Sequence, residues 1–147
     1  MNNKEEKLKV ENYGDMLAQV KGKELVSFTM FGDYQGEWFG VLKNEGELEF
    51  WRGYYGSCSG CDFLEAEGEF SWEDDFNGHF ITRKSAEEYF KEETPFLVAE
   101  ENVIMKASIE ELRTLLPKKV LDDAWDFDMQ EFYNDLHKKT TTKERNA

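Results

Sequence analysis

Long hydrophobic runs are missing from this sequence. No apolar stretch approaches the roughly 18 residues needed to cross a bilayer. The N-terminal segment MNNKEEKLKVEN also lacks the apolar core of a secretory signal. These absences predict a protein that does not span a membrane and resides in the cytoplasm, where thiols normally stay reduced.

Basic residues are scarce relative to acidic ones. The 18 Lys and Arg residues face 32 Asp and Glu residues, which gives a formal net charge of −14. The first nine residues carry a net +1 and the last ten a net +3, so the acidic charge is concentrated between them. This acidic body argues against direct nucleic-acid binding, which depends on Lys and Arg neutralising phosphates. The charge favours a protein partner with a basic surface, or it serves only to keep the protein soluble.

What the sequence does contain is enough apolar and aromatic material for one globular domain. The chain has 147 residues, of which 39% are hydrophobic and 15% aromatic, and this composition argues against disorder. Apolar residues at helical spacing predict a short helix over residues 11–20 that ends at Gly22. Alternating apolar residues then predict three strands, joined by the turns GDYQG and KNEG into an antiparallel meander. These strands span residues 24–31, 37–42 and 47–55.

The segment LEAEGEFSWE, which begins at Leu64, alternates between apolar and mostly acidic side chains. Period two predicts a strand with an acidic outer face. The outward carboxylates are those of Glu65, Glu67 and Glu69. A helix beginning near Asp62 is the alternative, because Asp is a good N-cap and FLEAE contains good helix formers. Asn77–Gly78 is a hairpin signal, after which residues 79–84 return antiparallel.

The last third of the chain has the signals of helices. The motifs SAEE at Ser85 and SIEE at Ser108 are both capping boxes, and Thr94–Pro95 resembles a third helix start. Pro117 stops the helix that the second capping box opens. An apolar stripe predicts a final helix. The stripe consists of Leu121, Trp125, Met129, Phe132 and Leu136.

These elements predict the fold class α+β. We expect a single domain over residues 1–137, with an antiparallel sheet of four to five strands, an N-terminal helix and C-terminal helices. Residues 138–147 have no apolar anchor and predict a basic flexible tail.

The two cysteines lie in the stretch GYYGSCSGCD, as Cys58 and Cys61. A thioredoxin-like redox pair needs its nucleophilic thiol at a helix N-terminus, usually within a βαβ unit. The flanking pattern here is a strand, a loop and then a further strand or a short helix, and no basic residue adjoins either thiol. A zinc site needs four ligands, and Cys58, Cys61, His79 and His137 are the only Cys and His residues. The surrounding Gly and Ser residues favour the third interpretation, a tight turn. We therefore expect no cofactor, with zinc at the two cysteines as the alternative.

Catalytic motifs are not recognisable. Carboxylate pairs are frequent in so acidic a chain, but no particular pair is marked as facing a cleft. No Ser-His-Asp order, phosphate-binding loop or dinucleotide fingerprint is present. An enzyme is disfavoured, and no catalytic residue is predicted.

Aromatic residues gather around the three predicted strands. Neighbours such as Trp38 and Phe39 must point to opposite faces of a sheet, so some rings leave the main core unless helices cover both faces. Exposed aromatic rings are typical anchors of protein interfaces. The predicted partner-binding residues are Tyr34, Trp38, Tyr54, Tyr55, Glu65, Glu67 and Glu69.

Two motifs carry a resemblance. The segments GDYQGEWF, from Gly32, and YYGSCSGCD, from Tyr54, resemble a family of small uncharacterised proteins encoded by phages and by bacteria. The resemblance covers residues 31–62 and transfers no catalytic residue. It implies that residues 32–36 and 56–62 share one structural or functional surface.

The resemblance also implies a function by analogy. Small acidic phage proteins often occupy host machinery, and some present carboxylates as a duplex presents phosphates. The resulting expectation is a non-enzymatic protein that inhibits or modulates a nucleic-acid-processing or defence protein in the host cytoplasm by charge mimicry. The alternative is a metal-binding or thiol-redox protein that uses Cys58 and Cys61.

Overall fold

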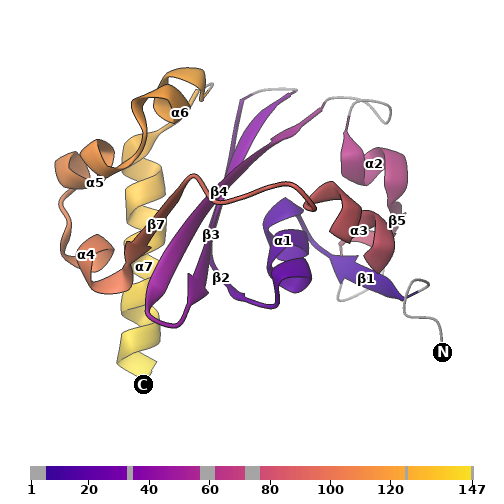
Figure 1. Ribbon diagram of the computed structural model, residues 1–147, viewed down its shortest axis with the longest axis horizontal. Helices are drawn as coiled ribbons and strands as arrows, with labels where there is room; N and C mark the ends of the chain where they lie inside the picture. Colours follow the sequence, from indigo (N-terminus) through magenta and orange to yellow (C-terminus); the bar gives the residue numbers. More distant parts are fainter. Residues whose placement is uncertain (1–5, 33–34, 57–61, 72–76, 125, 147) are drawn as a thin grey trace.

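Two antiparallel sheets organise the chain (Figure 1). The computed structural model describes residues 6–32, 35–56, 62–71, 77–124 and 126–146, with side chains up to Lys138. The four-stranded sheet has the order β2-β3-β4-β7, and the three-stranded sheet has the order β1-β6-β5. The first contains β2 (Glu24–Gly32), β3 (Gly36–Asn44), β4 (Glu47–Tyr55) and β7 (Leu97–Glu100). The second contains β1 (Lys7–Val10), β6 (Gly78–Thr82) and β5 (Glu69–Ser71).

The predicted meander is confirmed. Strands β2, β3 and β4 pair in sequence order, and the turn between β3 and β4 consists of only Glu45 and Gly46. Both turn residues have positive φ, 49° and 87°, which matches the right-handed twist of the strands that the turn joins. Sheet formation here is local, because each strand pairs with its neighbour in the chain.

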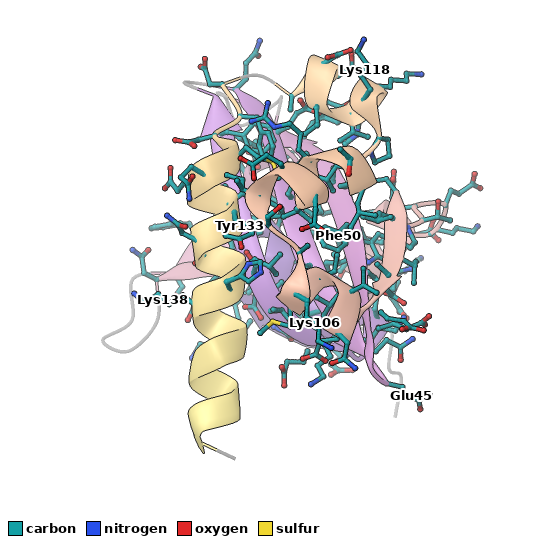
Figure 2. All side chains as sticks on the ribbon, turned by 90° about the vertical axis from the view of Figure 1, so that its left-hand side faces the viewer. Glu45, Phe50, Lys106, Lys118, Tyr133 and Lys138 are labelled. Atoms are coloured by element: carbon teal, nitrogen blue, oxygen red, sulfur yellow. The ribbon has the colours of Figure 1, made fainter. Side chains whose placement is uncertain are left out.

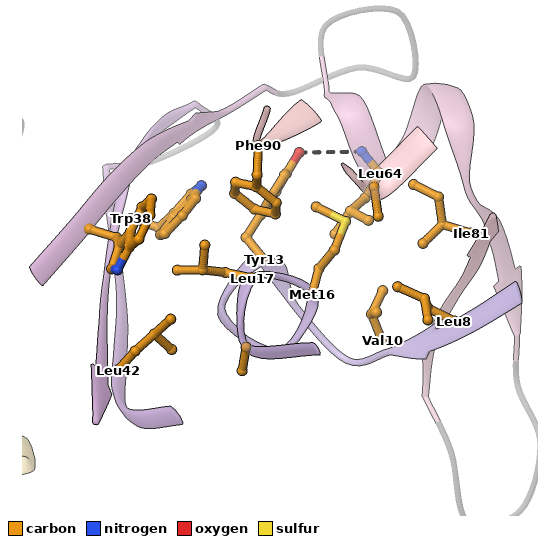
Figure 3. Close-up of a cluster of buried hydrophobic side chains, with 13 residues drawn as sticks. Leu8, Val10, Tyr13, Met16, Leu17, Trp38, Leu42, Leu64, Ile81 and Phe90 are labelled. Atoms are coloured by element: carbon orange, nitrogen blue, oxygen red, sulfur yellow. Dashed lines mark hydrogen bonds between the residues drawn. The ribbon is translucent and has the colours of Figure 1, made fainter. Parts of the chain in front are cut away.

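Helix α1 (Tyr13–Lys21) lies between the two sheets (Figure 1). The Asn12 side chain caps its start and Gly22 ends it in the left-handed conformation, as predicted. Gly14 permits a close approach to the four-stranded sheet, since a Cβ there would lie 2.5 Å from the Phe28 ring. Figure 3 shows the core that α1 builds between the sheets. Its labelled members are Leu8, Val10, Tyr13, Met16, Leu17, Trp38, Leu42, Leu64, Ile81 and Phe90.

Four helices cover the opposite face of the four-stranded sheet (Figure 2). They are α4 (Glu101–Lys106), α5 (Ile109–Leu115), α6 (Lys118–Asp123) and α7 (Met129–Asn146). The predicted capping box at Ser108 is complete, because Ser108 and Glu111 each accept the other's backbone N–H. Phe39 and Phe50 from the sheet meet Phe132 of α7 in this second core. No helix in the described part of the chain is long and apolar enough to cross a membrane.

The α+β class, the N-terminal helix and the C-terminal helices are confirmed, but the strand predicted over residues 64–73 is wrong over residues 64–67, and Trp72 and Glu73 lie outside the described residues. Helix α2 (Phe63–Glu67) forms there instead, and β5 occupies only Glu69–Ser71. The Asp62 side chain accepts the backbone N–H groups of Leu64 and Glu65, so a capped helix start prevails over the alternating pattern. The antiparallel return through β6 is confirmed.

Three further predictions are corrected. Helix α3 (Arg83–Tyr89) is capped by Thr82 rather than Ser85. Thr94–Pro95 begins no helix, since the chain continues into β7, which pairs with β4. The single final helix is corrected, because Leu121 lies on α6, the stripe from Met129 onward lies on α7, and Asp126 between them has a φ of 55° that a right-handed helix does not accommodate. Trp125 lies outside the described residues. Helix α7 extends to Asn146, and the flexibility of residues 138–147 stays a prediction.

Candidate functional site

The two motifs of the sequence meet at one end of the four-stranded sheet. The first residues of β3 and the last residues of β4 are adjacent there, because Gly36 is paired with Tyr55 and Glu37 with Tyr54. The Tyr55 hydroxyl also donates to the carbonyl of Phe31, at 3.0 Å, and connects the end of β4 to the end of β2. We call this region, residues 31–32, 35–37 and 54–56, the motif end of the sheet.

Asp62 closes the loop that follows the motif end. Its Oδ2 accepts the backbone N–H of Gly56 at 3.2 Å, so the two ends of the loop are bound to each other. Its Oδ1 accepts the Tyr13 hydroxyl at 2.6 Å and the N–H of Leu64 at 3.0 Å. One buried carboxylate therefore closes a loop, starts α2 and attaches both to α1. Cys58 and Cys61 lie within this loop, outside the described residues.

Two tyrosines near Asp62 are held in the neutral form. Burial, and then the hydrogen bond to Asp62, raise the pKa of Tyr13 well above its ordinary value, although the Leu64 N–H acts in the opposite direction. Burial also raises the pKa of Tyr89 to about 12, with the charges of Glu93 and Asp62 adding to the effect. A phenolate nucleophile would need a lowered pKa, so this cluster has the character of a structural network.

These tyrosines predict a loss of stability in alkali. Unfolded tyrosine titrates near pH 10, so below about pH 10 both states keep their phenol protons and the stabilisation is complete. Above about pH 10 the unfolded chain loses protons that Tyr89 retains until about pH 12, and Tyr13 to still higher pH. The free energy of unfolding should then fall with rising pH, by at most about 1.4 kcal/mol per pH unit for Tyr13 and by less for the partly exposed Tyr89. Urea unfolding between about pH 9 and pH 12 measures this slope.

The substitution Tyr89→Phe provides the control for that slope. It removes one titrating phenol and keeps the ring, so the decline above about pH 10 should become clearly shallower. An unchanged slope in this variant would contradict the assignment to Tyr89.

The structure separates the predicted aromatic residues. Trp38 is only 1% exposed, so its prediction as a partner-binding residue is corrected. Its ring stacks on Tyr13 at 5.8 Å and fits against Gly53 of β4, which has no side chain to hold it off. Tyr54 is 60% exposed, and Tyr55 is half-buried against Phe31. Tyr34 lies outside the described residues.

Tyr54 stands between two cavities. The first, of about 410 Å³, lies at the motif end, and we call it the motif cavity. It is lined by Gln35, Gly36, Glu37, Tyr54, Tyr55 and Asp123. The second, of about 260 Å³, lies where β4 loses its neighbour β7, and we call it the edge cavity. It is lined by Trp38, Arg52, Gly53, Tyr54, Tyr89, Phe90, Glu93, Thr94 and Phe96.

The carboxylates at these cavities were not among the predicted site residues. Exposed Asp123 of α6 borders the motif cavity, and exposed Glu93, after α3, borders the edge cavity. Both come from segments distant in sequence from Tyr54, and no local pattern indicates that they approach it. The cavity of about 500 Å³ between α5 and α7 was likewise not predicted, and its lining mixes Arg113, Lys118 and Asp122.

The predicted acidic residues belong to two elements rather than to one strand face. Glu65 and Glu67 lie on α2, and Glu69 lies on β5; all three are exposed. Glu65 Oε1 is 3.3 Å from His79 Nε2, and Glu69 Oε1 is 3.6 Å from the Lys7 ammonium. Such exposed pairs contribute little stability and leave the carboxylates accessible.

The two histidines do not share a metal site. His79 lies in the three-stranded sheet, whereas His137 lies on α7, beyond the four-stranded sheet. Both ring nitrogens of His137 face backbone carbonyls, at 3.0 and 3.2 Å. Within the described ranges no three His, Cys, Asp or Glu side chains are placed to hold a metal ion. The two histidines therefore lie on separate elements, and a zinc site at Cys58 and Cys61 stays a prediction.

The chain was compared with protein-family models, curated proteins and solved structures, and none of them matches.

Proposed function

We propose that the chain is a non-enzymatic protein-binding module that holds a basic segment of a partner protein around Tyr54. The observation that carries the proposal is the position of Tyr54, 60% exposed between two cavities that are each bordered by a carboxylate. An exposed ring beside carboxylates suits a Lys or Arg side chain, through ring–cation attraction and ion pairing. We call Gln35, Tyr54, Glu93 and Asp123 the Tyr54 surface.

The Tyr54 ring is in contact with a neighbouring side chain of the same strand, Arg52. The Arg52 guanidinium lies 5.8 Å from the centre of the Tyr54 ring, and its Nη1 is 3.4 Å from Oε1 of the buried Glu37. The contact with Arg52, which is itself held by Glu37, restricts the Tyr54 ring before a partner binds, so less side-chain conformational entropy is lost on binding. The net charge of −14 adds long-range attraction for a basic partner.

The most specific form of the proposal is charge mimicry. The resemblance to phage and bacterial proteins, together with the acidic body, supports an inhibitor or modulator of a host nucleic-acid-processing or defence protein in the host cytoplasm. The exposed carboxylates of α2 and β5 would then stand where phosphates bind. The alternative at Cys58 and Cys61 stays a prediction, because both thiols lie outside the described residues.

Capture from a bacterial lysate on the immobilised protein, followed by purification of the captured partner, tests the proposal. The substitution Tyr54→Ala should raise the dissociation constant for that partner about tenfold or more, since a truncated central aromatic anchor costs that much. Affinity should also fall as salt rises, because screening weakens the attraction.

Phe70→Ala is the matched control for that measurement. Phe70 is an exposed aromatic residue, at 47%, but it lies on β5, away from both cavities. Its removal should cost clearly less affinity than Tyr54→Ala does, because it leaves the Tyr54 surface and the neighbouring Glu69 carboxylate in place. Equal losses in the two variants, or binding that does not respond to salt, would contradict the proposal.

A further inference from the structure

We infer that the partner segment binds as an added strand: an extended, basic peptide pairs with the open edge of β4 from Arg52 to Tyr55. This inference rests on the proposed function and specifies the conformation of the partner. It concerns main-chain groups of β4, whereas the Tyr54 surface consists of side chains.

The edge of β4 is open because β7 covers only half of it. The pairing with β7 extends from Glu47 to Phe50, and the last bond goes from the Phe96 N–H to the Phe50 carbonyl, at 2.8 Å. Before Phe96 the chain leaves the sheet toward α3 (Figure 1). From Trp51 to Tyr55, β4 therefore has β3 on one side and, among the described residues, no strand on the other.

The main-chain groups at this edge point outward. The Glu101 N–H donates to the Gly46 carbonyl at 2.8 Å, and the Phe50 carbonyl accepts from Phe96, so the even-numbered positions of β4 face β7. Strand geometry repeats every two residues, so Arg52 and Tyr54 direct their N–H and C=O groups to the same side. The two N–H groups and two carbonyl groups of Arg52 and Tyr54 thus lie on the same edge of β4 that pairs with β7, where they can form hydrogen bonds with an added strand.

The side-chain environment along the edge alternates in the same period. Gly53 lines the edge cavity, where the rings of Trp38 and Phe90 provide an apolar lining. Tyr54 and Asp123 border the motif cavity at the next position. An incoming strand that alternates apolar and basic residues would place its apolar side chains near Gly53 and its basic ones near Asp123.

The other strand edges are less suited to this role. β1, β5 and β7 have only three or four residues each. β2 is long, but its pairing is irregular between Leu25 and Ser27, and Ser27 is hydrogen-bonded to Asp135 of α7 at 2.6 Å. Bulges and covering helices are the features that protect sheet edges from added strands. The β4 edge combines a regular strand, a cavity and an exposed aromatic residue.

A five-residue peptide, Lys-Leu-Lys-Leu-Lys with blocked termini, serves as the probe, with the amide resonances of the full-length protein as the readout. Addition of the peptide should shift the amides of Arg52 and Tyr54 most. Two N-methylated forms of the peptide, one methylated at Leu and one at Lys, keep the side chains and charges but block opposite backbone edges. One form should lose about tenfold or more in affinity and the other should bind like the parent, because only one peptide edge pairs with β4.

Three outcomes would overturn the inference. Equal binding of both N-methylated forms, with binding still lost in Tyr54→Ala, would leave the proposed function standing and exclude strand addition. Absence of binding by the parent peptide would exclude an extended basic segment as the occupant. A dimer in sedimentation, with the Arg52 and Tyr54 amides protected from exchange before peptide is added, would assign the edge to a second copy of the chain.

Discussion

Replacing Asp62 by alanine is expected to lower the free energy of unfolding by about 3 kcal/mol. The carboxylate accepts four hydrogen bonds from four different residues and is itself 9% exposed. Its removal eliminates the N-cap of α2 and leaves the buried Tyr13 hydroxyl without its acceptor. Urea denaturation near neutral pH measures the loss, and faster proteolysis between Gly56 and Asp62 would report the opening of the loop.

Two variants distinguish this network from an ordinary helix cap. In Asp62→Asn the Oδ1 acceptor is kept, but an amide N–H₂ opposes the Gly56 N–H, so we expect about half the loss. Asp128 caps α7 in the same way, through the N–H groups of Gln130 and Glu131, but it is exposed. Asp128→Ala should therefore cost only about 1 kcal/mol. Equal losses in Asp62→Ala and Asp128→Ala would mean that Asp62 acts as a cap alone.

Local signals predicted those elements whose partners are adjacent in the chain. The β2–β3–β4 meander needs only two short turns, and the capping box at Ser108 needs only four residues, so both could be read directly. β1 and β7 escaped prediction because each is four residues long and pairs with a distant strand. The start of α2 depends on Asp62, whose contact with Tyr13 spans 49 positions. The alternating pattern from Leu64 onward favours a strand, but the hydrogen bonds of Asp62 to Tyr13 and to the first turn of α2 stabilise a helix start instead.

The candidate site was predictable only in part. Composition and period two indicated that some rings around β3 and β4 would leave the core, and exposed Tyr54 is one of them. Trp38 and Tyr54 could not be told apart, because the space for the Trp38 ring is made by Gly53 on the neighbouring strand and by Tyr13 on α1. Asp123 lies at the motif cavity only because α6 packs against the sheet, and no local sequence pattern predicts that packing.

The substitution Gly53→Ala is expected to destabilise the fold by about 3 kcal/mol. A Cβ at this position would lie 2.4 Å from Cε2 and Cζ2 of Trp38, which is closer than real side chains approach. Trp38 cannot retreat, because it is 1% exposed and packs against the rings of Tyr13, Phe28 and Phe90. Overpacking of a rigid core costs about 1–3 kcal/mol and occasionally more, and here the backbone of β4 must move. The movement would displace the neighbouring Tyr54 as well, so partner binding should weaken together with stability.

Gly40→Ala is the matched control, because it adds the same methyl group on the same face of the adjacent strand. Its Cβ would lie 3.4 Å from Trp38 Cζ3, an ordinary contact, so we expect a change below about 1 kcal/mol. The substitution Trp38→Phe should partly rescue Gly53→Ala, since the smaller ring vacates the space that the methyl group needs. The double variant should then lose less stability than the sum of the two single losses, by about 1 kcal/mol or more. Strictly additive losses would show that the Trp38 ring does not occupy the space beside Gly53. The burial of Trp38 could then not be attributed to the missing side chain at Gly53.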